Sequence, residues 1–315
     1  MKKILVTGSS GFIGNNLCQR LTKLNRDVVG TFRNREIYSN NKFKKISVGN
    51  IDKDIDWGNA LKDIDCIIHC AGKANAMNKK SELDIFRLIN VEGTKILAEQ
   101  GVKAGVKRFI FLSSVKVNGE SFHSTKNHKL YNNRDRPNPK DPYAISKFEA
   151  EKVLSEISNK MGLEVVILRL PLVYGFGAKG NLYRLMKLIN YNVPLPFSLI
   201  KNKRSLIGID NLVDVLIRCI DNPDAKGKIF LASDGEDLST PELIELIALS
   251  MEKKANLFPV PISLLKFLSS IFGKREEINR LVGSLRIDNS YTKEILNWTP
   301  PISVEEGIRK MVQGK

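Results

Sequence analysis

The chain has 315 residues, of which 42% are hydrophobic and 27% charged, and its formal net charge is +16. This composition is ordinary for a globular protein, and the length suits one large domain or two interlocked ones. No stretch approaches the roughly 18 uninterrupted apolar residues of a membrane span. The apolar run near the N-terminus is only three residues long, which is too short for a signal peptide.

The positive charge attracts anions in general and does not select among nucleic acid, acidic lipid and phosphorylated small molecules. The lysines are scattered and form no long basic block, so the sequence predicts a solvated surface and no nucleic-acid partner. The apolar segment 262–272 is short and is interrupted by Lys266, which favours a core or surface helix over a membrane-surface helix. We therefore expect no stable membrane insertion.

The cysteines show neither paired spacing nor neighbouring histidines suited to a metal. They are Cys18, Cys66, Cys70 and Cys219. Cys66 and Cys70 lie in or beside an apolar run, as buried thiols do. The sequence therefore predicts reduced, buried thiols in a cytoplasmic protein, without a bound metal.

Short apolar runs alternate with longer segments of helical periodicity through the first 170 residues. The runs rich in β-branched residues are 3–6, 27–30, 44–48, 66–72, 108–114 and 164–170. The segments between them, such as 15–24 and 85–105, repeat apolar residues every three or four positions. This alternation predicts βαβ units and a doubly wound parallel sheet with helices on both faces.

The order is less regular after about Gly175. Helices are expected at 210–220 and 240–251, and proline-bearing loops lie between them. We predict an α/β fold with a dinucleotide-binding domain over 1–175 and a smaller α/β substrate-binding region over 176–315. A strand at 228–233 is expected to return to the main sheet. The polar segment 123–142 is a long loop, and such loops are often functional.

Three glycines at a spacing of three residues follow the first predicted strand. Gly8, Gly11 and Gly14 stand in the sequence TGSSGFIG, between that strand and a helical pattern. In this context the first glycine permits a tight turn, the second lets the backbone approach a pyrophosphate, and the third lets helix pack on strand. The free N–H groups at the helix N-terminus then face the anion. The turn thus predicts a bound dinucleotide.

The end of the second predicted strand bears on which dinucleotide binds. An NAD enzyme commonly places an acidic residue there for the ribose 2′-hydroxyl, whereas an arginine can hold the 2′-phosphate of NADP. Here Arg33 follows the strand, and Asp27 lies at its opposite end. This favours NADP over NAD, and the alternative is that Arg33 is only a surface charge.

A tyrosine and a lysine four residues apart form the candidate catalytic pair. Tyr143 and Lys147 lie in the sequence YAISK at the start of a helical pattern, which puts them on one helix face. A neighbouring ammonium would lower the pKa of the phenol and fit it for proton exchange with an alcohol. Ser114 ends an apolar strand about thirty residues upstream and can converge with the pair at the carboxyl edge of the sheet.

The sequence resembles the extended short-chain dehydrogenase/reductase family, which includes nucleotide-sugar epimerases, dehydratases and reductases. The resemblance rests on TGSSGFIG, on FLSSVKVNG (111–119), on YAISK and on NVEGT (90–94), and it covers nearly the whole chain. It implies a Rossmann fold, with Tyr143 as acid/base, Lys147 lowering its pKa and binding the nicotinamide ribose, and Ser114 bound to the reacting oxygen. It also implies a homodimer through the two long helices that carry Asn90 and Tyr143.

The resemblance further implies two sets of binding residues. For NADP or NAD these are Gly8, Ser10, Gly11, Phe12, Ile13, Gly14, Arg33, Asn50, Ile51, Cys70, Ala71, Gly72, Lys73, Asn90, Tyr143, Lys147 and Pro171. For a UDP-sugar substrate they are Ser114, Lys116, Asn118, Asn181, Leu182, Arg204 and Arg280. Arg204 is expected to pair with the nucleotide diphosphate, because a guanidinium donates two parallel bonds to phosphate oxygens.

Departures from the family motifs narrow the expected reaction. Val115 and Lys116 replace the acidic pair of the 4,6-dehydratases, so dehydration is not expected. Asn118, Leu172 and Gly208 replace the usual tyrosine, asparagine and histidine, so the sugar pocket differs from that of a typical UDP-galactose 4-epimerase.

The whole pattern is most similar to bacterial reductases of UDP-4-keto-6-deoxy-N-acetylhexosamines, which make precursors of surface polysaccharide. A reductase exchanges its cofactor in each cycle, and Arg33 agrees with NADPH as the donor. The alternative is a UDP-hexose 4-epimerase that retains NAD. A more remote alternative is a non-catalytic member of the fold that binds RNA or serves as a scaffold.

Overall fold

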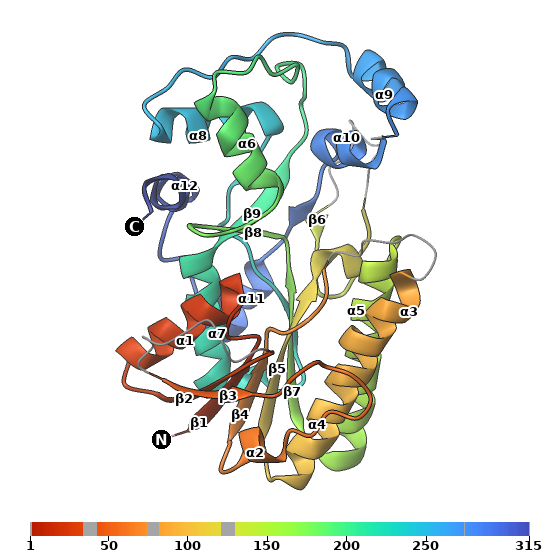
Figure 1. Cartoon of the computed structure of the whole chain (residues 1–315), viewed down its shortest axis with the longest axis vertical. Helices are drawn as coiled ribbons and strands as arrows, with labels where there is room; N and C mark the ends of the chain where they lie inside the picture. Colours follow the sequence, from red (N-terminus) through yellow and green to blue (C-terminus); the bar gives the residue numbers. More distant parts are fainter. Residues whose placement is uncertain (1, 34–42, 75–81, 121–129, 274, 315) are drawn as a thin grey trace.

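The computed structural model describes residues 2–33, 43–74, 82–120, 130–273 and 275–314. The described chain forms two lobes, with a parallel sheet in the lower lobe and a smaller helical lobe above it (Figure 1). No helix among the described residues is long and apolar enough to cross a membrane.

The described part of the chain contains a seven-stranded sheet in which every neighbouring pair is parallel. In spatial order its strands are β10 (Ile229–Leu231), β7 (Glu164–Leu170), β5 (Arg108–Ser114), β4 (Cys66–His69), β1 (Lys3–Thr7), β2 (Asp27–Phe32) and β3 (Lys44–Ser47). The order reverses at β1, so the loops after β1 and β4 leave the sheet in opposite directions and open a crevice at its carboxyl edge. The predicted doubly wound parallel sheet is confirmed.

Helices cover both faces of this sheet and bury an apolar layer on each. On one face lie α1 (Phe12–Lys23), α7 (Ile209–Asp221) and α11 (Ser290–Leu296); on the other lie α2 (Gly58–Leu61), α3 (Glu82–Phe86), the π-helix η1 (Arg87–Glu92), α4 (Gly93–Lys103) and α5 (Pro142–Met161). Strands β1, β4 and β5 are buried along nearly their whole length. This explains their uninterrupted apolar sequences.

The predicted helix at 85–105 is built differently from the expectation. It begins as α3, widens into η1 and continues as α4, so the segment contains a π-helical stretch of six residues. Such wide turns are frequently found at functional sites. Here the turn carries Asn90, whose buried side chain contacts Lys73 in the loop after β4.

The upper lobe has a small sheet and its own apolar core. Its strands are β11 (Asp237–Leu238), β9 (Arg204–Gly208) and β8 (Leu172–Tyr174), and its helices are α6 (Asn181–Asn190), α8 (Thr240–Ser250), α9 (Ile262–Ile271), α10 (Arg275–Val282) and α12 (Val304–Gln313). Two short strands, β6 (Leu130–Tyr131) and β12 (Arg286–Ile287), pair beside it, and the 3₁₀ turns are η2 (Val115–Val117) and η3 (Pro223–Ala225).

Segments on either side of residue 175 mix between the lobes. Strand β8 precedes this residue but pairs with β9 of the upper lobe. Strand β10 and helices α7 and α11 follow it but pack on the main sheet. The division into 1–175 and 176–315 stays a prediction, because the chain passes between the two lobes more than once.

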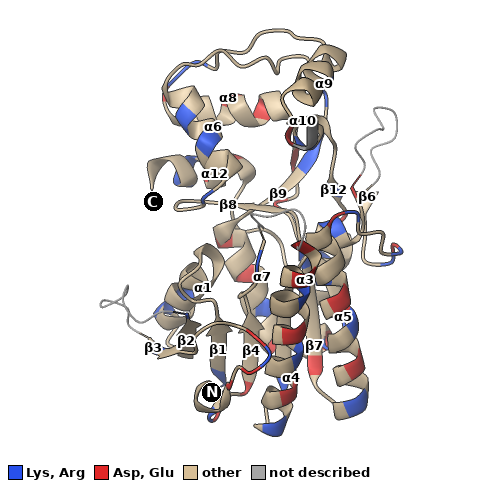
Figure 2. Cartoon of the chain, turned by 45° about the vertical axis from the view of Figure 1, so that its right-hand side comes forward, with Lys and Arg blue, Asp and Glu red and all other residues tan. Residues whose placement is uncertain are grey.

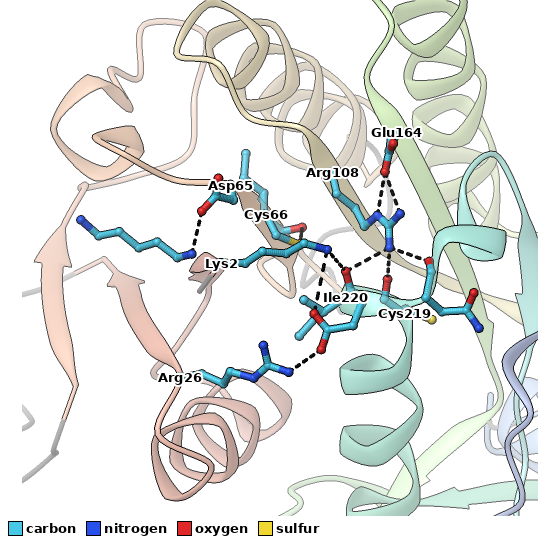
Figure 3. A network of polar contacts seen from close by, with 12 residues as sticks. Lys2, Arg26, Asp65, Cys66, Arg108, Glu164, Cys219 and Ile220 are labelled. Carbon is cyan, nitrogen blue, oxygen red and sulfur yellow. Dashed lines mark hydrogen bonds and ion pairs between the residues drawn. The ribbon is translucent and has the colours of Figure 1, made fainter.

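A buried arginine joins helix α7 to the amino edge of the sheet (Figure 3). The guanidinium of Arg108, at the start of β5, donates hydrogen bonds to the carbonyl oxygens of Cys219, Ile220 and Asn222 and pairs with Glu164. These carbonyls belong to the end of α7, where the backbone has no helical donor and the dipole is negative. The contact therefore ties a helix from the second half of the chain to the first.

Candidate active site

The glycine turn after β1 has the backbone that a dinucleotide requires. Gly8 has a φ of 66°, and a Cβ there would lie 2.9 Å from the backbone N of Ala71. A Cβ on Gly14 would lie 2.3 Å from the Gly8 carbonyl oxygen, so α1 packs directly on the turn. No side chain caps the N-terminus of α1 at Gly11. The N–H groups of that first turn can therefore donate to a phosphate.

The remaining expected residues of the turn line its two sides. Ser10 is exposed at the tip, while Phe12 and Ile13 are half-buried against the apolar core below α1. Behind the turn, Ser9 donates both its backbone N–H and its hydroxyl to the Thr31 carbonyl of β2. This contact holds the turn against the second strand, where the adenosine half of a dinucleotide would lie.

The adenosine side of the crevice carries the residues that bear on cofactor choice. Arg33 is exposed one residue beyond β2, and Ser47 donates a hydrogen bond to its carbonyl oxygen. Asn50 is exposed beyond β3, and Ile51 lies half-buried against Gly93 of α4. Arg33 thus lies at the carboxyl edge of the sheet, where a 2′-phosphate would be held.

The loop after β4 forms the opposite wall through Asn90. The side-chain amide of Asn90 accepts from the backbone N–H of Lys73 (2.8 Å) and donates to the Lys73 carbonyl and the Ser146 hydroxyl (3.0 Å each). A Cβ on Gly72 would lie 3.2 Å from Asn90 Oδ1 and 3.4 Å from Lys147 Nζ. The structure thus brings Gly72, Lys73, Asn90 and Lys147 together around one bare stretch of backbone.

A buried histidine that was not predicted as a site residue supports this wall. His69 at the end of β4 exchanges hydrogen bonds with Thr7 (2.7 Å) and Thr94 (3.1 Å), and Thr94 donates to the Asn90 carbonyl. Thr7 also accepts from the backbone N–H of Ala71. Burial lowers the pKa of His69 to about 3, so the ring is neutral. Its place beside Cys70 and Ala71 in the sequence was the available signal.

Helix α5 begins at a cap that also fixes the turn after Ser114. Asp141 accepts from the backbone N–H of Ala144 (2.7 Å) and pairs with Lys116 Nζ (2.6 Å). Lys116 also pairs with Glu120 (2.8 Å). The ammonium of Lys116 is therefore already bound by the carboxylates of Asp141 and Glu120, and its predicted role in substrate binding stays a prediction.

The catalytic candidates lie on β5 and α5, which pack against each other at the carboxyl end of β5. Ser114 is the last residue of β5, and its hydroxyl accepts from the backbone N–H of Lys116 (3.3 Å). Lys147 donates to the Leu112 carbonyl (2.8 Å), and its ammonium lies 4.5 Å from the centre of the Phe111 ring. Tyr143 stands one helical turn before Lys147 and contacts Phe86 edge to face.

The pKa of Tyr143 differs from the expectation. Burial raises it to about 12, and the nearby Asp141 carboxylate adds to the rise. The expected lowering by Lys147 is wrong for this structure, because burial disfavours the phenolate and the ammonium is directed at the Leu112 carbonyl. Burial also lowers the pKa of Lys147 to about 8. Tyr143 is therefore a neutral phenol at pH 7, which suits it to donate a proton.

A second network missed in the sequence lies one turn further along α5. Glu151 accepts from the Ser113 hydroxyl (2.5 Å) and forms a buried ion pair with Arg169 of β7 (2.6 Å). Arg169 also donates to Asn118 (3.1 Å). Asn118, expected to contact substrate, thus has its side chain in this buried cluster. Pro171, expected near the cofactor, is buried two residues after Arg169.

The upper lobe contains four of the residues that were expected to bind substrate. Arg204 contacts Arg280, whereas the neighbouring Asn181 and Leu182 differ in their exposure. Arg204 at the start of β9 donates to the carbonyl oxygens of Arg280 and Gly283 at the end of α10. Burial lowers the pKa of Arg204; the nearby Glu120 carboxylate opposes this effect, and the positive charge of Arg280 adds to it. At the start of α6, Asn181 is exposed, but the side chain of Leu182 is buried in the core of the lobe. Only the backbone of Leu182 remains to face a ligand.

The chain is similar in sequence to known 4-epimerases. A protein of Vibrio cholerae described as UDP-glucose 4-epimerase is 42% identical over 315 residues, which cover 99% of this chain and 95% of that protein. An N-acetyl-alpha-D-glucosaminyl-diphospho-ditrans,octacis-undecaprenol 4-epimerase of Escherichia coli O157:H7 is 30% identical over 63% of this chain and 61% of its own length. These names favour the epimerase alternative over the expected reductase.

The fold has solved counterparts. The structure of UDP-glucuronic acid 4-epimerase from Bacillus cereus in complex with NAD superposes with a TM-score of 0.80, at 23% identity, over 99% of this chain and 96% of that one. At this identity the likeness concerns the fold. The model of the NAD dependent epimerase/dehydratase family matches residues 4–232, which is most of the chain. With the glycine turn, the Asn90 wall and the Ser114, Tyr143 and Lys147 cluster in place, the chain belongs to the NAD dependent epimerase/dehydratase family.

Proposed function

We propose that the protein is a UDP-hexose 4-epimerase that retains NAD. The observation that carries the proposal is the set of Ser114, Tyr143 and Lys147 at one crossing of β5 and α5, beside the glycine turn. The relative from Vibrio cholerae, similar over nearly its whole length, is described with this activity. The nicotinamide of the cofactor supplies the site that takes and returns a hydride.

The protein's own residues supply the proton chemistry. Tyr143 exchanges a proton with the oxygen on C4, and Ser114 holds that oxygen at the end of β5. Lys147 keeps a positive charge beside Gly72 and Asn90, where it binds and orients the ribose of the cofactor. The epimerase cycle needs Tyr143 both to accept this proton and to return it, and its pKa of about 12 favours the returning step at pH 7.

The diphosphate of the substrate is assigned to Arg204 and Arg280. Arg204 is half-buried and is held by backbone carbonyls, and the charge of Arg280 lies close enough to lower its pKa, against the opposite effect of Glu120. Two guanidiniums in such proximity repel each other, and a diphosphate would remove that repulsion. The nucleotide would then extend along the upper lobe while the sugar points to Tyr143.

One observation favours a second candidate, the reduction of a UDP-4-keto-6-deoxy-N-acetylhexosamine by NADPH. Arg33 stands at the carboxyl end of β2, where an NAD enzyme commonly has an acidic residue. A reductase must release its oxidised cofactor after each cycle, whereas an epimerase reuses the same one. The two candidates therefore differ in whether cofactor is consumed.

An assay with the purified protein separates the two functions. For the epimerase we expect UDP-glucose and UDP-galactose, or their N-acetylated forms, to interconvert without added cofactor and without net change at 340 nm. The opposite result is no interconversion, together with loss of NADPH absorbance when UDP-2-acetamido-2,6-dideoxy-4-hexulose is added. That result would overturn the epimerase and support the reductase.

A further inference from the structure

The end of the upper lobe that lies farthest from the main sheet is unusually apolar. It consists of α9 and of two loops, 191–203 and 251–261, which pair through Leu195 and Leu257 and are seen at the same end in both views (Figures 1 and 2). More than half of the large hydrophobic side chains exposed in the described structure lie in these segments or next to them. They are Tyr191, Val193, Leu199, Leu249, Phe258, Leu264, Phe267, Leu268, Ile271 and Phe272. We call this set the apolar end.

Helix α9 leaves most of its large apolar side chains exposed. Phe267 and Ile271 are each 62% exposed, and Phe272 just beyond the helix is 74% exposed, whereas Leu265 and Ser269 are buried. Positions 264, 267, 268 and 271 follow the three-and-four spacing of one helix face. Among the described residues, no side chain of α9 joins the core of the lobe. This face is therefore built to be covered by something other than the protein's own core.

The charges around the apolar end indicate what covers it. Segments 191–203 and 251–273 together contain five lysines and one acidic residue, Glu252, and α9 itself has Lys266 and no acidic residue. A second copy of the chain would bring the same positive charge against this face, which opposes self-association. An anionic bilayer surface offers the opposite charge and an apolar layer for Phe267 and Ile271.

We propose that the apolar end binds the surface of an anionic lipid bilayer, with α9 lying in the interface. The arrangement is that of an amphipathic helix with aromatic and aliphatic residues on one side and basic residues around it. It needs no membrane-spanning helix, and the described residues contain none. Helix α10 packs on α9 and ends at the carbonyls that hold Arg204, so the docked surface would adjoin the assigned diphosphate site. The proposal does not depend on which reaction the enzyme catalyses.

The test is sedimentation of the full-length protein with vesicles. We expect co-sedimentation with vesicles of phosphatidylcholine and phosphatidylglycerol at low ionic strength, and weaker binding to phosphatidylcholine alone. The double variant Phe267→Ser/Ile271→Ser should bind at least about tenfold more weakly, because two large apolar side chains no longer enter the interface. The matched control Leu24→Ser/Met161→Ser, which changes two exposed apolar residues elsewhere, should bind like the wild type.

A second variant guards against misfolding. Lys254→Glu/Lys266→Glu leaves the apolar residues in place and should weaken binding to the anionic vesicles. The proposal is overturned if the wild-type protein does not sediment with anionic vesicles, or if neither double variant reduces binding. It is also overturned if the wild type forms an oligomer that Phe267→Ser/Ile271→Ser disperses while no vesicle binding occurs, since a second copy would then cover the face.

Discussion

The pKa values of Tyr143 and Lys147 depend on their surroundings in the fold and not on their spacing in the sequence. Their spacing of four puts them on one face of α5, as expected. Burial nevertheless raises the pKa of Tyr143 to about 12 and lowers that of Lys147 to about 8. The Leu112 carbonyl and the Phe111 ring hold the ammonium instead. The position of the Lys147 ammonium thus depends on residues of β5 as well as on its place in α5.

Replacing Tyr143 with phenylalanine should reduce turnover by about two orders of magnitude or more, because the proposed proton donor is removed. The fold and cofactor binding should persist, since phenylalanine keeps the ring that contacts Phe86. The measurement is kcat on the substrate found in the assay above, with Tyr191→Phe as the control at an exposed loop position. Turnover close to that of the wild type would refute the assigned role.

His69 should make the stability of the protein sensitive to mild acid. Its pKa is about 3 in the folded chain, against about 6.5 when exposed, so the unfolded state binds more protons between these values. The stabilisation is complete above pH 6.5 and is lost progressively as the pH falls towards 3. We expect a slope of up to about 1.4 kcal/mol per pH unit from this one group.

Urea unfolding of the wild type and of His69→Gln at pH 7, 6 and 5 measures this contribution. The variant should be less stable at pH 7, but its free energy of unfolding should fall less steeply with acid. His123 and His128 lie outside the described residues, and they are present in both proteins, so their contribution cancels. Parallel pH dependences in the two proteins would show that His69 is not held neutral.

At the scale of elements, three contacts dock α5 on the end of β5. They are the Lys116 pair with Asp141, the Lys147 bond to Leu112, and the Ser113 bond to Glu151. The contacts involve three successive regions of α5, and Ser114 and Tyr143 lie among them. The position of the serine hydroxyl relative to the phenol is therefore set by the docking of two whole elements.

The buried pair of Glu151 and Arg169 should be the most costly of these features to break. Glu151→Gln should lower the free energy of unfolding by about 3–5 kcal/mol, because it leaves Arg169 buried without a countercharge. Removing both charges in Glu151→Leu/Arg169→Met should cost clearly less. The control is Glu149→Gln. Glu149 lies on the same helix as Glu151 and forms a more exposed pair with Arg87 of η1, so that its loss should cost no more than about 1 kcal/mol.

Chemical denaturation of the four proteins gives these values directly. A loss for Glu151→Gln as small as that for Glu149→Gln would mean that the buried network does not support the docking of α5. The comparison holds the helix and the kind of substitution constant, so that burial is the variable.

At the scale of the whole molecule, the second half of the chain returns repeatedly to the first. Helix α7 packs on the main sheet and ends at Arg108, while β9 directly before it belongs to the upper lobe (Figure 3). The same stretch of chain therefore carries Arg204 of the assigned diphosphate site and the helix anchored below. The consecutive elements β9 and α7 are therefore one of the links between the two lobes.

Replacing Arg108 with methionine should destabilise the protein by about 2–4 kcal/mol, because three carbonyls at the end of α7 lose their donor. Lys2→Met is the matched control. Lys2 also donates to Ile220, but its side chain is 40% exposed, and its loss should cost less than about 1 kcal/mol. Equal effects of the two substitutions on urea unfolding would contradict the anchoring role of Arg108.

The features that the sequence predicted well are local in the chain. The glycine turn, the buried strands and the helix face shared by Tyr143 and Lys147 depend on residues a few positions apart, and their backbone periodicity is visible in the letters. The wide turn at Asn90 was not predicted, because a π-helical stretch has no periodicity of its own over six residues.

The sequence by itself determined the parallel α/β fold, the dinucleotide turn and the three catalytic candidates. The tertiary structure decided the pKa of Tyr143, the occupation of Lys116 and Asn118 by internal contacts, and the meeting of Arg204 with Arg280. The reason is that these last properties depend on burial and on partners far away in the chain. Hydrogen bonds and charges between such residues exist only once the elements have packed, and no local pattern encodes them.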